Sequence, residues 1–421
     1  MNSNPHVSHG PQLQLRIYAW AAMLFFMGAL THLMGGNDGE SGPLAALYQP
    51  IAALLYLVAG LYLVGAPAYR NSLRTYLLED RWMTLSLVIV VASTFWSIDH
   101  MLTARKSIAV VATTFSGLLI GFAFARSDLT TFLRRLYLVF IVCSVLVCVL
   151  LPTYGVHPAA DIEHAGRWRG LMSFKNQMAW TTVLFLLIWV APLRLRALFK
   201  PTNAIPFALG LFLLVMCGSA TGVLQFIFGA FVLLVLRSYF NAPRWRFLFL
   251  MFCLIGLAAL AVSAQMLLAA FLESSGRTET LSGRTVIWSE IWPFILERPW
   301  LGWGQNAFWS DATRFFGNSF WVGTRNHSHN AYIEVLIDLG IVGLTAQMMY
   351  MTSMLRRLWN LGKAGDPEAA TFLALVASLL MTGLAGALFF RANTGTWVLI
   401  SAISAYSFAR IKQRTVKGGL K

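Results

Sequence analysis

Long runs of apolar residues, separated by short polar segments, recur along almost the whole chain. Runs of about 20 such residues can cross a hydrocarbon core of roughly 30 Å as α-helices. The pattern predicts an all-α polytopic membrane protein with about 12 transmembrane helices. They are expected at roughly 16–34, 44–66, 82–98, 107–125, 134–152, 177–193, 204–218, 221–239, 247–271, 331–354, 368–390 and 394–409.

The largest polar interruption separates the ninth predicted helix from the tenth. We therefore divide the chain into a first helical part (1–271), a long and partly helical loop (272–330), and a last helical part with a short tail (331–421). With an even number of helices, both termini lie on the same side. Most of the 32 Lys and Arg residues fall in segments on that side. Since cytoplasmic segments carry the excess of positive charge, we expect both termini in the cytoplasm and the long loop outside.

Composition agrees with this class. Of the 421 residues, 57% are hydrophobic and 12% are charged, whereas an ordinary soluble domain has about 25% charged residues. The formal net charge of +15 would suit a nucleic-acid partner, but no nucleic-acid motif is present, and the positional bias that sets topology accounts for most of the charge. We expect contact with membrane lipids and no binding of nucleic acid.

Several basic residues nevertheless fall in segments predicted to be outside. One interpretation is contact with lipid headgroups at helix ends. The other, which we favour because several separate segments contribute, is a cationic basin for phosphate or pyrophosphate, which guanidinium groups grip in bidentate fashion. The candidates for this basin are Arg105, Arg167, Arg169, Lys175, Arg277, Arg284, Arg314, Arg325 and Arg391.

The long loop has an order of its own. Apolar residues recur at helical spacing over 287–295, and Gly302 and Gly304 then turn the chain. Arg284 stands at the start of this predicted helix, where exposed N–H groups and a guanidinium can face the same anion. The loop tryptophans suit a helix in the membrane interface, as a lid without chemistry of its own. They are Trp288, Trp292, Trp300 and Trp303.

Two histidines close the loop. His327 and His329 precede Asn330, which suits the N-cap of the tenth predicted helix. An imidazole titrates near neutral pH and can take a proton from an attacking hydroxyl, so we predict His329 as a general base, with His327 the second candidate. Alternatively, the two histidines have no chemical role and simply lie beside the helix N-cap. A zinc site would need further ligands. His100, His157 and His164 are available, but no Cys or Glu residue has a spacing that supports such a site. No metal is therefore expected.

The loop and the helix after it resemble the signature of the O-antigen ligase and polymerase superfamily. That signature contains a G-R-x-x-x-W segment, a G-x-G turn and an H-N-x-x-L-x-x-x-x-x-x-G-x-x-G segment that begins a helix. Here an isoleucine takes the place of the usual leucine. The matching positions are Gly283, Arg284, Trp288, Gly302, Gly304, His329, Asn330, Ile333, Gly340 and Gly343.

Two earlier segments also resemble parts of that family. The segment 167–179 resembles one that ends in Lys-Asn before a transmembrane helix. The segment 217–222 resembles a Ser-x-Thr-Gly turn, but it lacks the arginine often found there. We therefore predict tight helix packing, not ligand binding, for Ser219 and Thr221.

The resemblance implies a multi-pass glycosyltransferase of the bacterial inner membrane whose active site faces the periplasm. The ligase branch transfers a glycan from undecaprenyl pyrophosphate to a terminal sugar of lipid A–core. The polymerase branch transfers it to another repeat unit, and related enzymes transfer it to protein. One dominant loop and a short tail look most like the ligase, which implies inverting transfer without metal or cofactor, His329 as base and the arginines on pyrophosphate. A lipid-linked glycan transporter is the alternative of another class, but no predicted helix carries a mid-membrane ionisable residue of the kind that couples transport to ions.

Overall fold

A computed structural model describes residues 12–34, 42–161, 164–241, 284–311, 327–386 and 388–416. Within these ranges the protein is helical, and its β pairing is limited to one isolated bridge between Val156 and Trp168. The helices are α1 (Leu13–Phe26), α2 (Thr31–Met34), η1 (Ala45–Leu47), α3 (Tyr48–Gly65), α4 (Pro67–Glu79), α5 (Arg81–Ala92), η2 (Ser93–Phe95), α6 (His100–Phe124), α7 (Leu129–Leu150), α8 (Pro152–Gly155), α9 (Lys175–Val190), α10 (Leu195–Leu198), α11 (Pro201–Cys217), α12 (Ala220–Asn241), α14 (Arg284–Glu297), η5 (Phe308–Asp311), α17 (Ala331–Lys363), α18 (Ala369–Thr382) and α19 (Gly395–Val416).

A helix lies at each predicted membrane span outside residues 242–283. The ninth predicted span, 247–271, lies outside the described residues. By length and composition, five helical segments are able to cross a membrane, which makes this an α-helical membrane protein. The total of 12 spans stays a prediction. The five segments are Ala45–Gly65, His100–Phe124, Leu129–Leu150, Ala220–Asn241 and Ala331–Lys363.

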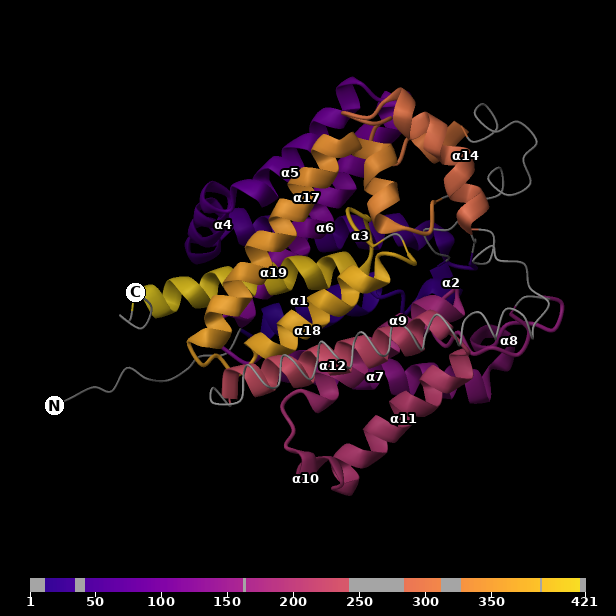
Figure 1. Ribbon diagram of the computed structural model, residues 1–421, viewed down its shortest axis with the longest axis vertical. Coiled ribbons are helices and arrows are strands. Elements are labelled where there is room, and N and C mark those ends of the chain that lie inside the picture. The colour runs from indigo at the N-terminus through magenta and orange to yellow at the C-terminus, as the bar shows by residue number, and fades with distance from the viewer. Residues whose placement is uncertain are drawn as a thin grey trace.

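The core of the bundle depends on close helix packing (Figure 1). Helix α6 lies against α19 through Gly117 and Gly121, four residues apart. A Cβ built on these glycines would stand 2.5 Å from the carbonyl oxygen of Val398 and 2.2 Å from that of Ala402. Small residues at this spacing let two helix backbones approach, as is common between helices in membranes.

The two ends of the described chain lie at one end of the bundle. Tyr62, near the end of α3, donates a hydrogen bond to Gln14 at the start of α1 (2.9 Å). Lys412, near the end of α19, pairs with Glu79 at the end of α4 (2.6 Å). Since α4 follows α3 directly, the start of α1 and the end of α19 share this end. The opposite end of the bundle therefore carries the end of α1 and the start of α19.

Helix α17 is interrupted at Gly340, where φ is 65° and ψ is −169°. The segment that follows α14 supplies partners for the backbone groups at this break, as buried peptide groups require. Two amides of that segment donate to α17, and two amides of α17 donate back. The four bonds are Trp303 N to Ile337 O (2.9 Å), Gly304 N to Asp338 O (2.8 Å), Ile341 N to Pro299 O (2.8 Å) and Val342 N to Trp300 O (3.2 Å).

Candidate functional site

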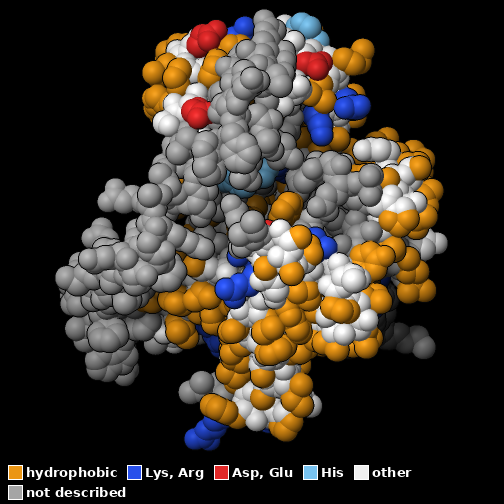
Figure 2. Space-filling view, turned by 90° about the vertical axis from the view of Figure 1, so that its right-hand side faces the viewer, with side chains coloured by type: hydrophobic (Ala, Val, Ile, Leu, Met, Phe, Trp, Pro, Cys, Tyr) orange, Lys and Arg blue, Asp and Glu red, His pale blue; other side chains and the backbone are white. Residues whose placement is uncertain are grey.

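A cavity of about 400 Å³ lies at the end of the bundle that carries the end of α1 and the start of α19. Its walls come from the last residues of α1, the first turns of α9 with the loop before them, the end of α18, the segment 385–396 and the histidines before α17. The space-filling view of Figure 2 shows histidine surface near the middle of this face, with Lys and Arg side chains beneath it.

The two histidines form a tight turn at the cavity. Their ring centroids are 4.1 Å apart, and the backbone N–H of His329 donates to Nδ1 of His327 (3.1 Å). In this arrangement Nδ1 of His327 is an acceptor, so the proton of its neutral ring lies on Nε2. His329 has a φ of 55°. A non-glycine residue in this region costs on the order of 1–3 kcal/mol and needs support from its surroundings.

Neighbouring side chains provide that support. Ser328, between the histidines, donates its N–H to Oε2 of Glu334 (2.7 Å), and its carbonyl accepts from Nε1 of Trp288 on α14 (2.9 Å). Asn330 is the N-cap of α17, because its Oδ1 accepts from two N–H groups of the first turn at 2.9 and 3.2 Å. The long loop and the start of α17 thus fix the turn together.

Two cations line the same cavity as the histidines. Lys175 is the first residue of α9, and Arg391 lies in the segment before α19. The fold therefore brings together four predicted site residues from three distant parts of the chain, namely Lys175, His327, His329 and Arg391.

Three other predicted cations do not line this cavity. Nε of Arg169 donates to the carbonyl of Tyr154 (2.9 Å). The guanidinium of Arg167 lies against Gly218, where an added Cβ would be 2.4 Å from Nη1. Arg105 is exposed on α6. Arg284 begins α14, as predicted, but its side chain lies outside the described part of the structure. So do the whole residues Arg277, Arg314 and Arg325.

Glu334 and Asp338 received no role from the sequence, yet both are buried. Oδ2 of Asp338 accepts from the backbone N–H of Asn306 (3.0 Å), much as Glu334 accepts from Ser328. The signal that could have found them is the pair of carboxyl groups four residues apart in the otherwise apolar first turns of α17. Together they tie α17 to the histidine turn and to the loop after α14.

The turn between α11 and α12 packs closely, in line with its small residues. A Cβ on Gly222 would stand 2.8 Å from that of Ala179. The turn also reaches residues that line the cavity. Ser219 donates to Oδ1 of Asn176 (2.8 Å), and Trp180 donates to Thr221 (3.4 Å). Through these two hydrogen bonds, Ser219 and Thr221 fix the first turns of α9.

His157 supports the start of α9 from the preceding loop. Its Nδ1 lies 3.0 Å from Asp161, and its Nε2 accepts from the N–H of Lys175 (3.3 Å). Burial, followed by the nearby charge of Arg169, lowers the pKa of His157 below its ordinary value. His164 packs edge-on against His157 and lines the cavity. Among the residues that the structure describes, no three His, Cys, Asp or Glu side chains gather in a way that suits a metal ion.

Two comparisons with known proteins bear on this geometry. Residues 205–348 match the model of a family described as O-antigen ligase. Over 368 residues the chain is 26% identical to the exopolysaccharide production protein ExoQ of Rhizobium meliloti (strain 1021), a match that covers 83% of this chain and 79% of that protein. Together they support the O-antigen ligase and polymerase superfamily. The matched region contains the histidine turn and the break in α17, and the superfamily indicates a ligase- or polymerase-type glycosyltransferase of polysaccharide synthesis.

Proposed function

We propose that this protein is an O-antigen ligase, which transfers a glycan from undecaprenyl pyrophosphate to a terminal sugar of lipid A–core. The observation that carries the proposal is the cavity in which His327 and His329 meet Lys175 and Arg391. Apolar side chains complete its lining and suit a polyprenyl chain. They include Phe25, Phe26, Leu30, Leu184, Leu379 and Leu388.

In the proposed reaction an acceptor hydroxyl attacks the anomeric carbon of the donor sugar. His329 takes the hydroxyl proton as the new carbon–oxygen bond forms. The bond between the anomeric carbon and the phosphate oxygen breaks, and its electron pair leaves with the lipid pyrophosphate. Lys175 and Arg391 hold that anion, a preorganised electrostatic role. A single displacement of this kind inverts the anomeric configuration.

Arg284 belongs in the same proposal. Its position at the start of α14 is close in the chain to Trp288, which bonds the histidine turn. The loop arginines Arg277, Arg314 and Arg325 are proposed as further contacts to the pyrophosphate. Arg105, Arg167 and Arg169 do not line the cavity and are proposed to attract the anionic lipid as it approaches.

The orientation follows from charge. The positive-inside bias of the sequence supports cytoplasmic termini. The cavity lies at the end of the bundle opposite the described chain ends, so it would face the periplasm. That is the side on which a lipid-linked glycan meets lipid A–core in the proposed reaction.

A second candidate function is polymerisation of polysaccharide repeat units. The relative that covers most of this chain is named as an exopolysaccharide production protein. Both reactions use the same donor chemistry and the same base, so the cavity fits either. They differ in the acceptor, which is lipid A–core in one and a second lipid-linked glycan in the other.

A deletion strain separates these functions. Lipopolysaccharide with a bare core, restored by the wild-type gene, is the result expected of a ligase. Core that bears a single repeat unit indicates a polymerase, and intact lipopolysaccharide with loss of a secreted polysaccharide indicates an exopolysaccharide enzyme. Purified protein given lipid-linked glycan and acceptor should form a new glycosidic bond; a transporter would move the glycolipid and leave the bond unmade.

A further inference from the structure

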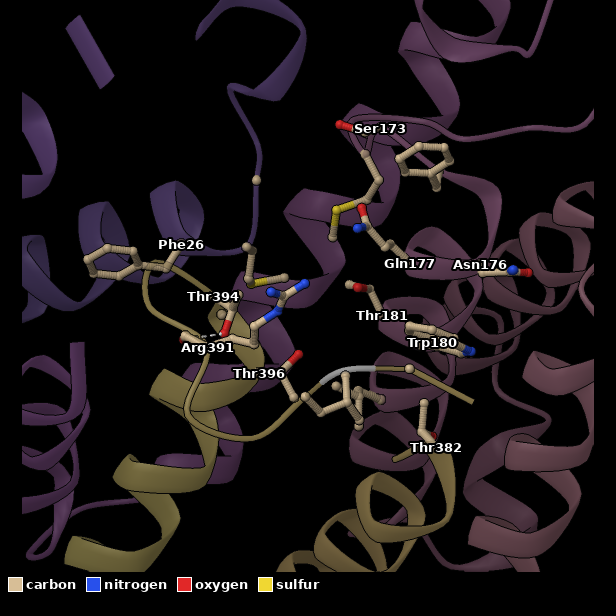
Figure 3. Close-up of a pocket in the computed structure, with 18 of the residues that line it drawn as sticks. Phe26, Ser173, Asn176, Gln177, Trp180, Thr181, Thr382, Arg391, Thr394 and Thr396 are labelled. Carbon is tan, nitrogen blue, oxygen red and sulfur yellow. Dashed lines mark hydrogen bonds between the residues drawn. The ribbon is translucent and has the colours of Figure 1, made fainter. Parts of the chain in front are cut away.

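We propose that the first turns of α9 and the loop just before it form a sugar-binding wall of this cavity, made of Ser173, Gln177, Trp180 and Thr181 and called here the α9 wall. All four line the cavity. Gln177 and Thr181 are four residues apart on α9, which places their side chains on one face of the helix, and Ser173 lies two residues before the helix begins. Figure 3 shows Gln177 and Thr181 pointing into the space across from Arg391. The proposal rests on the proposed function, because it takes a glycan as the ligand of this cavity.

Three side chains of the wall have hydrogen-bonding groups that are not used within the described ranges of the protein. Within the part of the chain that the structure describes, the side chains of Ser173, Gln177 and Thr181 make no hydrogen bond. The contrast with the next residue is direct, because Thr182 donates to the carbonyl of Met178 one turn back (2.8 Å). Polar side chains set in protein are normally paired. Ser173 is only 3% exposed, so its hydroxyl is set in protein and borders the cavity.

Trp180 is held at both of its ends. Its Nε1 donates to Thr221 (3.4 Å), and the far edge of its six-membered ring lies at Gly386, where an added Cβ would be 2.5 Å from Cη2. A larger residue at position 386 would displace the ring. The indole is therefore fixed in place and half-buried, with part of its surface in the cavity lining.

This combination of groups matches a pyranose rather than a phosphate. The wall carries an aromatic ring, an amide and two hydroxyls, and it carries no charge. A sugar ring offers C–H groups that pack on an indole and hydroxyls that pair with amide and hydroxyl groups. The charged groups Lys175 and Arg391 remain for the pyrophosphate. The sugar could come from the donor or from the acceptor, since both present the same chemistry.

The test compares variants of the wall in the purified full-length protein, reconstituted in lipid nanodiscs. Gln177→Leu and Thr181→Val remove hydrogen-bonding groups and keep volume. Thr182→Val is the matched control, because Thr182 is buried and already bonded to its own helix. The donor is the lipid-linked glycan fraction from cells that make this protein, and the acceptor is the glycolipid fraction from the same cells. Binding of bare undecaprenyl diphosphate is measured separately.

We expect Gln177→Leu and Thr181→Val each to raise KM about five- to tenfold, with kcat nearly unchanged, as loss of a ground-state hydrogen bond does. Affinity for bare undecaprenyl diphosphate should stay at the wild-type value. A rise in the KM for the donor, measured at varied donor concentration, assigns the wall to the donor sugar. A rise in the KM for the acceptor, measured at varied acceptor concentration, assigns it to the acceptor. Unchanged KM values in both series overturn the proposal, as does an equal loss of affinity for the bare lipid.

Failure of the proposed function would look different. Wild-type protein that forms no glycosidic bond contradicts the transferase proposal itself. In that case, retention of the extracted glycolipids on immobilised protein still tests the wall. Gln177→Leu should then retain less glycolipid than wild type and as much bare undecaprenyl diphosphate. Equal retention of glycolipid by both proteins rejects the wall.

Discussion

Gly340 lies directly against the backbone of Trp300. A Cβ built on Gly340 would stand 2.2 Å from the carbonyl oxygen of Trp300, and its φ of 65° is one that L side chains rarely adopt. The next two amides of α17 donate to the same loop segment. The loop segment therefore fills the break in α17. Gly302 of the loop and Gly340 of the helix, which both match the family signature, lie where the two backbones meet.

Gly340→Ala should destabilise the protein by about 2 kcal/mol or more, because its φ of 65° and ψ of −169° lie in a region that is essentially confined to glycine and costs other residues on the order of 1–3 kcal/mol, and the backbone of Trp300 must also move. Thermal unfolding of the purified protein in detergent measures the effect. Gly60→Ala in α3 is the control, since nothing lies within 4 Å of its added Cβ, and it should be neutral or slightly stabilising. Equal melting temperatures of the two variants would contradict this close packing of Gly340 against Trp300.

The elements of the fold follow largely from the sequence. A run of apolar residues in lipid has one way to satisfy its backbone, so each run outside 242–283 is a helix. Helix α4 was not expected, because residues 67–79 form a polar segment between two predicted membrane spans, a pattern typical of a connecting loop. The break at Gly340 was not expected either, since the hydrophobic pattern continues through it. Its cause is a hydrogen-bonding partner about 40 residues earlier, which periodicity cannot reveal.

The candidate site was predicted only in part. The histidine turn and Asn330 are local, so the sequence places them next to one another. Lys175 and Arg391 were two among many outer cations. Their place beside the histidines results from the packing of α9, α18 and α19, which no local pattern encodes. The α9 wall was missed because neutral residues at the start of a helix and in the loop before it resemble ordinary surface positions until the cavity that they line is known.

His329→Asn should lower the rate of transfer about a hundred- to ten-thousand-fold, the range typical of a lost general base. Asparagine tolerates positive φ better than alanine does, so this change removes the imidazole and spares the turn. Initial rates with lipid-linked glycan and acceptor give the comparison. His100→Asn, at the exposed start of α6, is the control and should act as wild type. Normal activity of His329→Asn, with loss of activity in His327→Asn, would assign the base to His327 instead.

Arg391→Lys should lower kcat/KM at least about tenfold, although the charge is kept. Lysine lacks the planar fork that binds two phosphate oxygens at once. Arg105→Lys makes the same exchange on the exposed face of α6, outside the cavity, and should change the rate little. Kinetics at varied donor concentration distinguish the two. Equal effects of both changes would mean that Arg391 acts as one surface charge among several.

The loop before α9 should make stability depend on pH through His157. Its pKa is lowered in the folded protein, chiefly by burial, so folding favours the neutral ring. As the pH falls through about 6.5, the ordinary value for histidine, the unfolded chain takes up a proton first and the folded state loses stability. The loss is complete below the folded pKa. Protonation of Nε2 also removes the acceptor of the Lys175 N–H, at the first residue of α9.

We therefore expect the melting temperature of the wild-type protein to fall as the pH is lowered from 8 toward 5, and His157→Gln to fall less steeply. Glutamine can still accept a hydrogen bond through Oε1 but cannot titrate. The two proteins differ only at this side chain, so the difference between the two profiles isolates His157. Parallel profiles would show that its protonation is not coupled to folding, and that the bond to Lys175 does not depend on the neutral ring.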